Sequence, residues 1–383
     1  MTPRGSLTSM RTSIHGSWSE AGDVLPDAGV GRACASLQSR RVRLHDYCIP
    51  ASRFAHAPAN TTVWRRGVAL LGNELHTDNF HHFNRDLLFF ARMLHRGLVT
   101  AETVSHVVVT DHSELVSWAI EHARVVLGPQ LVQRLVFLPR KRAPRSTGRA
   151  QLSNATLPRA RYVCFDAAVE KLVTDPIDRD DVAWMRARAY DACGVPRAIP
   201  PSSPRLLLLL LRGDPSVHDK PTTARQMANG DEVRTALDAF ARAHGLLLHA
   251  TAFAGMTYCE QVRLASAARV LVGVHGQGFT NGQFMPDDGL VVELFHGGQR
   301  PFWSRFDNVG HQPLFLGAGR PYVAAPYADS PCSMMQWKHD VACKSHVNST
   351  RLLALLTWAM RLEVEGAVSE EAVSTVGANV IGL

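Results

Sequence analysis

The stretch VGVHGQGFTNGQFMPDDGLVVELF, Val272 to Phe295, decides the fold. It begins inside an apolar run from Val270 to Val274 and ends in a second run from Leu290 to Phe295. Runs that are apolar at every position are typical of strands buried on both faces of a parallel sheet. Between them, His275-Gly276-Gln277-Gly278 supplies two glycines that permit a tight turn and a close backbone approach. The pattern predicts strand, glycine turn, short helix and strand in a parallel α/β fold.

The residues after the turn predict a helix start that suits a phosphate. Thr280 and Gln283 have the spacing of a capping box, and Pro286 is expected to end the helix after about one turn. The N–H groups and the helix dipole at such a start favour an anion. The candidate phosphate-binding residues are His275, Gly276, Gly278, Thr280 and Asn281. A purely structural turn is the alternative.

Polar side chains near other strand ends extend this candidate site. Glu293 interrupts an apolar strand, where an unpaired carboxylate is costly, and it is expected to accept ribose hydroxyls. A salt bridge to an arginine is the alternative for Glu293. Arg212 closes a run of six leucines, and Arg225 and Asn229 follow it. Because guanidinium groups match phosphate oxygens, these residues predict a diphosphate site.

The rest of the chain repeats the alternation of short apolar runs with amphipathic helices. Its 383 residues suit two domains. We expect an irregular segment over 1–60, an α/β domain over 61–194, a proline-rich linker over 195–204, a second α/β domain over 205–345, and a C-terminal helix and tail over 346–383. Folds of this kind bind ligands at the carboxyl ends of their strands.

The composition of the chain restricts the classes of ligand and partner that it suits. The net charge of +7 suits an anionic ligand. The basic run from Pro139 to Ala150 contains no aromatic residue to stack a base, so a solvated loop is expected there rather than nucleic-acid binding. No stretch approaches the roughly 18 apolar residues of a membrane span. Residues 1–40 also lack the apolar core of a signal peptide.

Other features point to the secretory pathway. Three sequons for N-glycosylation begin at Asn60, Asn154 and Asn348. Two cysteine pairs are close enough in sequence to form short disulfide loops, Cys34 with Cys48 and Cys332 with Cys343. Cys164 and Cys259 have the apolar neighbours of buried thiols. We expect a lumenal protein of the Golgi or endoplasmic reticulum whose membrane anchor, if it has one, lies outside this chain; the cytoplasm is the alternative.

The order of the motifs resembles the C-terminal half of glycosyltransferase family 61, which includes plant β-1,2-xylosyltransferases and O-GlcNAc transferases acting on EGF repeats. The similar segments are the leucine strand ending at Arg212, then Arg225 to Asn229, Glu260-Gln261-Val262, HGQGFTN, FMP and VVEL. The family motif reads HGAGLTN. In this chain Gln277 takes the place of its alanine, and Phe279 takes the place of its leucine. The likeness covers Leu206 to Phe295, and in the first half only Asp78 to Leu88.

The resemblance implies a GT-B-like fold, two Rossmann-like domains facing a central cleft, with the last helix packing back across the domains. It also implies an inverting glycosyltransferase that moves a sugar, xylose or GlcNAc, from a UDP-sugar to a hydroxyl of a glycan or protein. No metal cofactor is expected, since the second half has no Asp-x-Asp triplet. A non-catalytic nucleotide-sugar-binding or chaperone-like member of the same fold is the alternative.

The catalytic base is expected in the first domain. His82 and Asp86 are four residues apart in a predicted helix from Asn79 to Arg96, so they share a face. Asp86 would hold the His82 imidazole in one tautomer or take the acceptor's proton itself. An ordinary helix surface pair is the alternative. A metal cluster at His81, His82 and their neighbours is not expected, because the spacing divides them between loop and helix.

Overall fold

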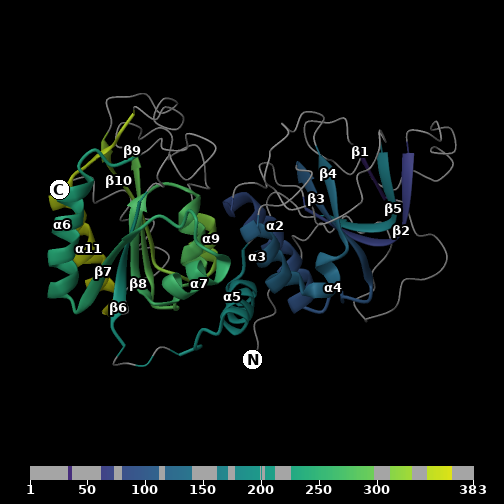
Figure 1. The fold of residues 1–383 in the computed structure, drawn as a ribbon, viewed down its shortest axis with the longest axis horizontal. Coiled ribbons are helices and arrows are strands. Elements are labelled where there is room, and N and C mark those ends of the chain that lie inside the picture. Colours follow the sequence, from purple (N-terminus) through teal and green to yellow (C-terminus); the bar gives the residue numbers. More distant parts are fainter. Residues whose placement is uncertain are drawn as a thin grey trace, which may run out of the picture. The chain divides into compact units, whose positions relative to one another are not determined.

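The computed structural model describes residues 33–36, 62–72, 80–111, 117–139, 162–170, 177–198, 200, 203–211, 226–296, 311–329 and 343–364. The chain divides into two compact units, Met1–Asp175 and Pro176–Leu383. Each unit has its own sheet, with parallel pairing between most neighbouring strands (Figure 1). The predicted mixed α/β class with parallel sheets is confirmed.

The sheet of the first unit has the order β1-β5-β2-β3-β4. Its strands are β1 (Ala33–Ser36), β2 (Thr62–Leu71), β3 (Val104–Asp111), β4 (Leu135–Pro139) and β5 (Tyr162–Glu170). All neighbours pair in parallel except β1, which is antiparallel to β5. The series β4-β3-β2-β5 has the 3-2-1-4 order of a Rossmann half, with its switch point between β2 and β5.

The helices of the first unit follow its strands in the order that the alternation predicted. They are α2 (Phe80–His95), α3 (Ser117–Leu127) and the short α4 (Pro129–Val132). In α2, Phe83, Leu87 and Phe90 are fully buried and recur at helical spacing, so they form the core-facing stripe. Phe80 at the start of α2 packs on Trp118 of α3 at 5.0 Å between ring centroids.

The sheet of the second unit has the order β11-β10-β9-β8-β6-β7. Its strands are β6 (Arg205–Leu210), β7 (Leu246–Thr251), β8 (Ala268–Val274), β9 (Leu290–His296), β10 (Tyr322–Asp329) and β11 (His346–Val347). Among the described strands of this sheet, β11 alone is antiparallel to its neighbour, β10. Starting from β6, the parallel strands have the 2-1-3-4-5 order of flavodoxin-like folds, whose ligands bind at the switch between the first and third strands. Here that switch lies between β6 and β8.

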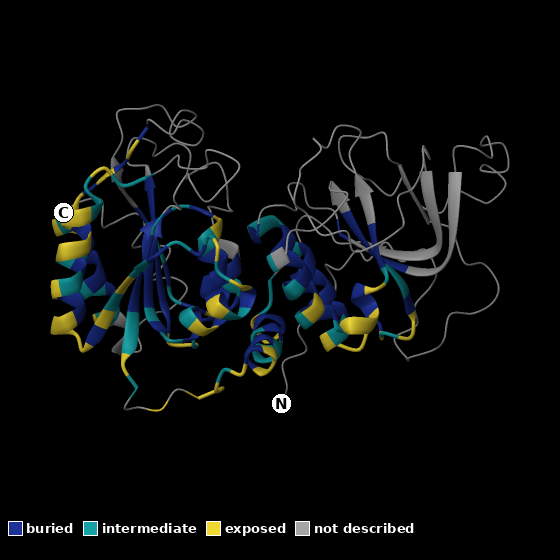
Figure 2. Ribbon diagram, viewed as in Figure 1, coloured by how far each residue is buried: buried dark blue, intermediate teal, exposed yellow. Residues whose placement is uncertain are grey.

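Helices cover both faces of this second sheet (Figure 1). On one face lie α6 (Gly230–Ala243) and α11 (Ser349–Val364). On the other lie α5 (Arg179–Cys193), α7 (Tyr258–Ser266), the 3₁₀ helix η3 (Gln277–Phe284) and α9 (Gln312–Gly317). The central strands are buried over most of their length, whereas α6 exposes its outer side (Figure 2). This burial on both faces explains why β6, β8 and β9 are apolar at nearly every position.

The C-terminal helix α11 packs within its own unit. Leu352, Leu355 and Leu356 are buried in one cluster with Val233 and Leu237 of α6. The expectation that this helix reaches across to the other domain stays a prediction. None of the helices in the described part of the chain is both long enough and apolar enough to cross a membrane.

Helix α5 belongs to the second unit, although the sequence division put residues 61–194 in the first domain. Arg186 Nη1 donates to the carbonyl oxygen of Met285 at 2.8 Å, and the Tyr190 hydroxyl donates to the carbonyl oxygen of Phe284. The second unit accordingly begins at Pro176. The prolines of 195–204 therefore lie between α5 and β6 of one unit, not between two units.

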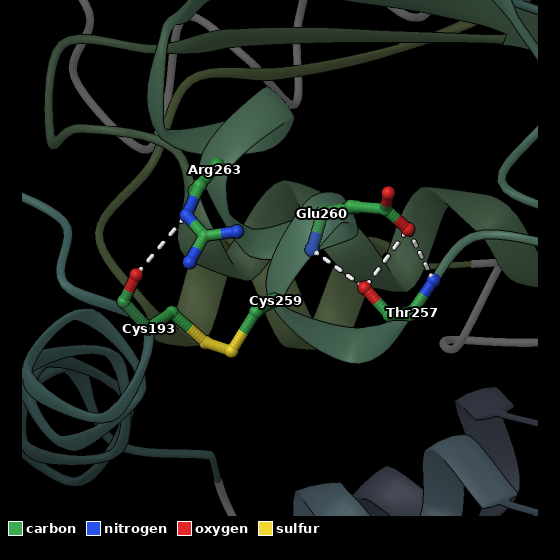
Figure 3. The surroundings of a disulfide bond; sticks show 5 residues. All are labelled: Cys193, Thr257, Cys259, Glu260 and Arg263. Atoms are coloured by element: carbon green, nitrogen blue, oxygen red, sulfur yellow. Dashed lines mark hydrogen bonds between the residues drawn. A yellow bond between two sulfur atoms is a disulfide. The ribbon is translucent and has the colours of Figure 1, made fainter.

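A disulfide joins α5 to α7 (Figure 3). Cys193 at the end of α5 is bonded to Cys259, 66 residues later, and Arg263 Nε donates to the Cys193 carbonyl oxygen at 3.1 Å. The prediction that Cys259 is a buried thiol is wrong. Cys343 is also disulfide-bonded. Its predicted partner Cys332 lies outside the described residues, so that pairing stays a prediction.

Candidate functional site

The glycine turn lies at the switch point of the second sheet. His275 follows β8 directly, and its backbone N–H donates to the Leu294 carbonyl oxygen at 2.9 Å, which extends the pairing with β9 by one residue. A Cβ on Gly273 would lie 2.6 Å from the Leu210 carbonyl oxygen, and one on Gly278 would lie 3.0 Å from Leu210 Cδ2. The turn therefore packs directly against the end of β6, and these two glycines allow that approach.

The segment after the turn is helical, but it is not capped as predicted. It forms the eight-residue 3₁₀ helix η3 with Gly276 at its N-cap and no side-chain capping bond. The Thr280 hydroxyl and both polar atoms of the Gln283 amide are buried and have no hydrogen-bond partner among the described residues. The expected capping box between Thr280 and Gln283 is therefore absent. Pro286 does end the helix, because Met285 before it takes an extended conformation.

Asn281 links η3 to the neighbouring helix α7 by a hydrogen bond. Its Nδ2 donates to Gln261 Oε1 at 3.0 Å and to the Gly278 carbonyl oxygen at 3.3 Å. Gln261 Nε2 in turn donates to the Met256 carbonyl oxygen at 3.1 Å. Asn281 therefore shapes the turn, and only its Oδ1, which is buried without a partner in the described part of the chain, has capacity left for a ligand.

Glu293 is the centre of a buried hydrogen-bond network. Its Oε1 accepts from Nδ1 of His275 at 2.6 Å and from Nδ1 of His311 at 2.8 Å. Its Oε2 accepts from the Tyr322 hydroxyl at 2.7 Å and from the backbone N–H of His311 at 3.2 Å. The side chain of Glu293 has no exposed surface. Both oxygens are thus occupied by protein donors, and the expected contact with ribose hydroxyls is not available to them. The alternative, a salt bridge to an arginine, is not what the structure shows either.

Electrostatics keep this carboxylate charged. Burial alone would raise the pKa of Glu293, but His311 and His275 outweigh it and hold the pKa well below its usual range. Burial, followed by the neighbouring Glu293, raises the pKa of Tyr322 well above its usual range. Since a carboxylate only accepts hydrogen bonds, both imidazoles must donate from Nδ1. The side chain of His275 is 24% exposed, and Nε2 is its ring nitrogen that does not face Glu293.

The same three side chains also form a group that a metal ion could use. The ligand atoms of His275, Glu293 and His311 lie within 4.8 Å of one another. The separation of 2.6 Å between His275 Nδ1 and Glu293 Oε1 is that of a hydrogen bond. A zinc ion about 2.1 Å from both atoms would see them at about 76°, far from the tetrahedral angle of about 109°. We therefore describe the group as a hydrogen-bonded network.

The other predicted donor-site residues have different outcomes. Asn229 donates from Nδ2 to the Val347 carbonyl oxygen at 2.9 Å and accepts from the Val347 backbone N–H at 2.9 Å. Its amide thus pairs with β11 like a strand residue, and the expected ligand contact stays a prediction. Arg212 and Arg225 lie outside the described residues.

The candidate catalytic pair lies on α2 in the first unit. Asp86 is fully buried, and its carboxylate lies directly against Gly72 at the end of β2, where any Cβ would clash with it. This position is next to the switch point between β2 and β5. His82 is partly buried and its ring lies 5.5 Å from that of His81. Asp86 therefore lies at the strand end that the fold favours for a ligand.

Two residues of the Glu293 network were missed by the sequence analysis. His311 is the N-cap of α9, and Tyr322 begins β10. His311 is 2% exposed and its ring lies 5.8 Å from that of Phe279 in η3. The only available signal was Glu293 itself, since a carboxylate within an apolar strand requires partners from elsewhere.

Together the fold and the site define an α/β protein with a glycine turn at the switch point of its second sheet. The family model Glycosyltransferase 61 matches residues 23–292, more than half of the chain. The chain therefore belongs to glycosyltransferase family 61, as the resemblance of HGQGFTN and its neighbouring motifs predicted. Membership implies glycosyltransferase activity, with a sugar donor and an acceptor. None of the curated proteins searched matches the chain.

Proposed function

We propose that the protein is an inverting glycosyltransferase that transfers a sugar, xylose or GlcNAc, from a UDP-sugar to a hydroxyl of a glycan or protein. In this proposal the two units are the halves of a GT-B fold, with the donor at the second unit and the acceptor at the first. The observation that carries it is the His275–Glu293 network beside the glycine turn, at the switch point between β6 and β8.

The donor's diphosphate would lie at the turn. Gly276 has no side chain to obstruct it, the N–H groups at the start of η3, including that of Gly278, would donate to it, and His275 in its protonated form would add a donor from Nε2. Arg212, two residues beyond the end of β6, and Arg225 would supply positive charge. With this charge the departing UDP needs no Mg²⁺. We therefore propose turnover without a metal cofactor.

The base of the inverting step would come from α2. Asp86 or His82 would accept the proton of the acceptor hydroxyl as its oxygen attacks the anomeric carbon. The Cys193–Cys259 disulfide and the three sequons support a site of action in the lumen of the endoplasmic reticulum or Golgi, because disulfides persist in oxidising compartments.

Calorimetric titration of UDP tests the donor site. Arg212→Ala should weaken UDP binding by about 1.5 to 3 kcal/mol, as the loss of a charge-assisted hydrogen bond would. The matched control is Arg234→Ala, which removes an exposed arginine on α6 and should leave UDP affinity unchanged. Equal UDP affinity in wild type and Arg212→Ala would refute the assignment.

Release of UDP separates the enzyme from the non-catalytic alternative. Purified protein is incubated with UDP-xylose or UDP-GlcNAc, with and without a glycan acceptor, in buffer containing EDTA. Acceptor-dependent release of UDP in EDTA supports both turnover and metal independence. Activity that appears only when manganese is restored contradicts metal independence. Tight UDP binding without any UDP release favours the binding or chaperone role.

A further inference from the structure

On one face of η3, three buried polar atoms have no hydrogen-bond partner among the described residues. They are Thr280 Oγ1 and the Nε2 and Oε1 atoms of Gln283, and neither side chain has any exposed surface. Buried polar atoms are nearly always hydrogen-bonded in native proteins, and an unsatisfied group costs about 1 to 3 kcal/mol. An apolar residue at position 283 would avoid this cost. The described part of the chain supplies no such partner for the amide.

The geometry of η3 puts these atoms on one face. Side chains three residues apart eclipse one another in a 3₁₀ helix, so Gln277, Thr280 and Gln283 are aligned. Gln277 is exposed, whereas Thr280 and Gln283 are buried. With a rise of about 2 Å per residue, each step along this face covers about 6 Å. The polar face thus leads from the surface at the glycine turn into the interior.

The other two faces of η3 are used for packing. Gly278 and Phe284, on one of them, pack against Leu210 of β6 and Tyr258 of α7. On the next, Gly282 lies so close to Phe315 of α9 that a Cβ would be 2.8 Å from its ring. The face with Thr280 and Gln283 is the one on which η3 keeps polar side chains at every position.

We propose that the Thr280 hydroxyl and the Gln283 amide bind the hydroxyl groups of the donor's sugar and so contribute to the choice of sugar. This inference rests on the proposed function, with the diphosphate at the turn. A sugar hydroxyl both donates and accepts a hydrogen bond. The amide offers one donor and one acceptor, and the threonine hydroxyl offers either, so the three atoms match two neighbouring hydroxyls of a pyranose. Gln283 acts here as a specificity-determining residue.

The test compares UDP with a UDP-sugar in Gln283→Met. Methionine keeps the length of the side chain and removes both polar atoms. Wild type is first screened by calorimetry against UDP, UDP-xylose, UDP-GlcNAc, UDP-glucose, UDP-galactose and UDP-arabinose. For the sugar that binds best, the ratio of its Kd to the Kd of UDP should rise about 10-fold or more in the variant, while the Kd of UDP stays the same. The melting temperature of the ligand-free variant should equal or exceed that of wild type.

Matched controls keep the outcomes distinct. Gln133→Met makes the same change at an exposed position of the first unit and should leave the ratio unchanged. Thr280→Val should also raise the ratio of the UDP-sugar Kd to the UDP Kd. If Gln283→Met does not fold, Thr280→Val serves as the test of the inference in its place. An unchanged ratio would mean that the buried atoms hold ordered water only, which overturns the inference but not the donor site. UDP binding by wild type without binding of any UDP-sugar overturns it too. Failure of wild type to bind UDP would instead overturn the proposed function.

Discussion

Replacing Glu293 by glutamine should destabilise the second unit strongly. The carboxylate accepts four hydrogen bonds, two on each oxygen. An amide retains one oxygen, so its NH₂ group must face the other pair of donors. If that pair is the Tyr322 hydroxyl and the His311 backbone N–H, the hydroxyl can rotate and accept, but the N–H cannot. At least one buried donor is then left unsatisfied.

The expected loss in free energy of unfolding follows from the hydrogen bonds that the substitution breaks or weakens. An unsatisfied buried donor costs about 1 to 3 kcal/mol, and each of the two histidine bonds loses roughly 1 kcal/mol of charge assistance. We therefore expect Glu293→Gln to lower the free energy of unfolding by about 3 to 5 kcal/mol, a large part of the roughly 5 to 15 kcal/mol of a typical domain.

Hydrogen exchange read by mass spectrometry measures this change within the second unit. Peptides from β8 and β9 should exchange much faster in Glu293→Gln, whereas peptides from β3 in the first unit should not change. Glu260→Gln is the matched control, since Glu260 is an exposed carboxylate that only caps α7. Exchange in β8 and β9 that differs from wild type by less than about 1 kcal/mol would refute the network.

Three further predictions concern other parts of the chain. Asp86→Asn and His82→Ala should each lower turnover about 100-fold or more with UDP affinity retained, and near-normal rates would place the base elsewhere. Burial lowers the pKa of His122 to about 3 from 6.5, so the unfolded state takes up the proton first as pH falls. Stability should therefore drop below pH 6.5, by about 2 kcal/mol at pH 5, and His122→Gln should abolish this loss in urea titrations. Cys193→Ser should cost about 4 kcal/mol of stability, and non-reducing peptide mapping should recover Cys193 linked to Cys259.

The sequence alone predicted where the strands lie. It did not predict which residues the polar side chains of those strands would contact. Continuous apolar runs such as Leu206 to Leu211 predict buried parallel strands, and β6 occupies nearly the same residues. Glu293 was recognisable as a buried polar residue. Its partner His311, 18 residues away, could not be identified, because no periodic pattern connects the two positions. The disulfide partner of Cys259 could not be identified either, since Cys193 lies 66 residues away in sequence.

The prediction of a capping box was wrong for a more specific reason, which is the type of helix that forms. A spacing of three residues places Thr280 and Gln283 for reciprocal capping at the start of an α-helix. In a 3₁₀ helix the same spacing stacks the two side chains along one face. The sequence alone does not distinguish these helix types over eight residues. The residues of the turn were therefore identified correctly while their hydrogen bonds were not.

The attachment of α5 to the second unit sets the place at which this protein can be recombined with a relative. The linker expected from the sequence would place the join of a chimaera at the proline-rich stretch 195–204. A join there would exchange the second sheet but keep the original α5, leaving Cys259 without its partner and the end of η3 without Tyr190. A join just before Pro176 transfers the helix together with the surface it covers. Under the proposed function, the donor site would be transferred with it as one intact module.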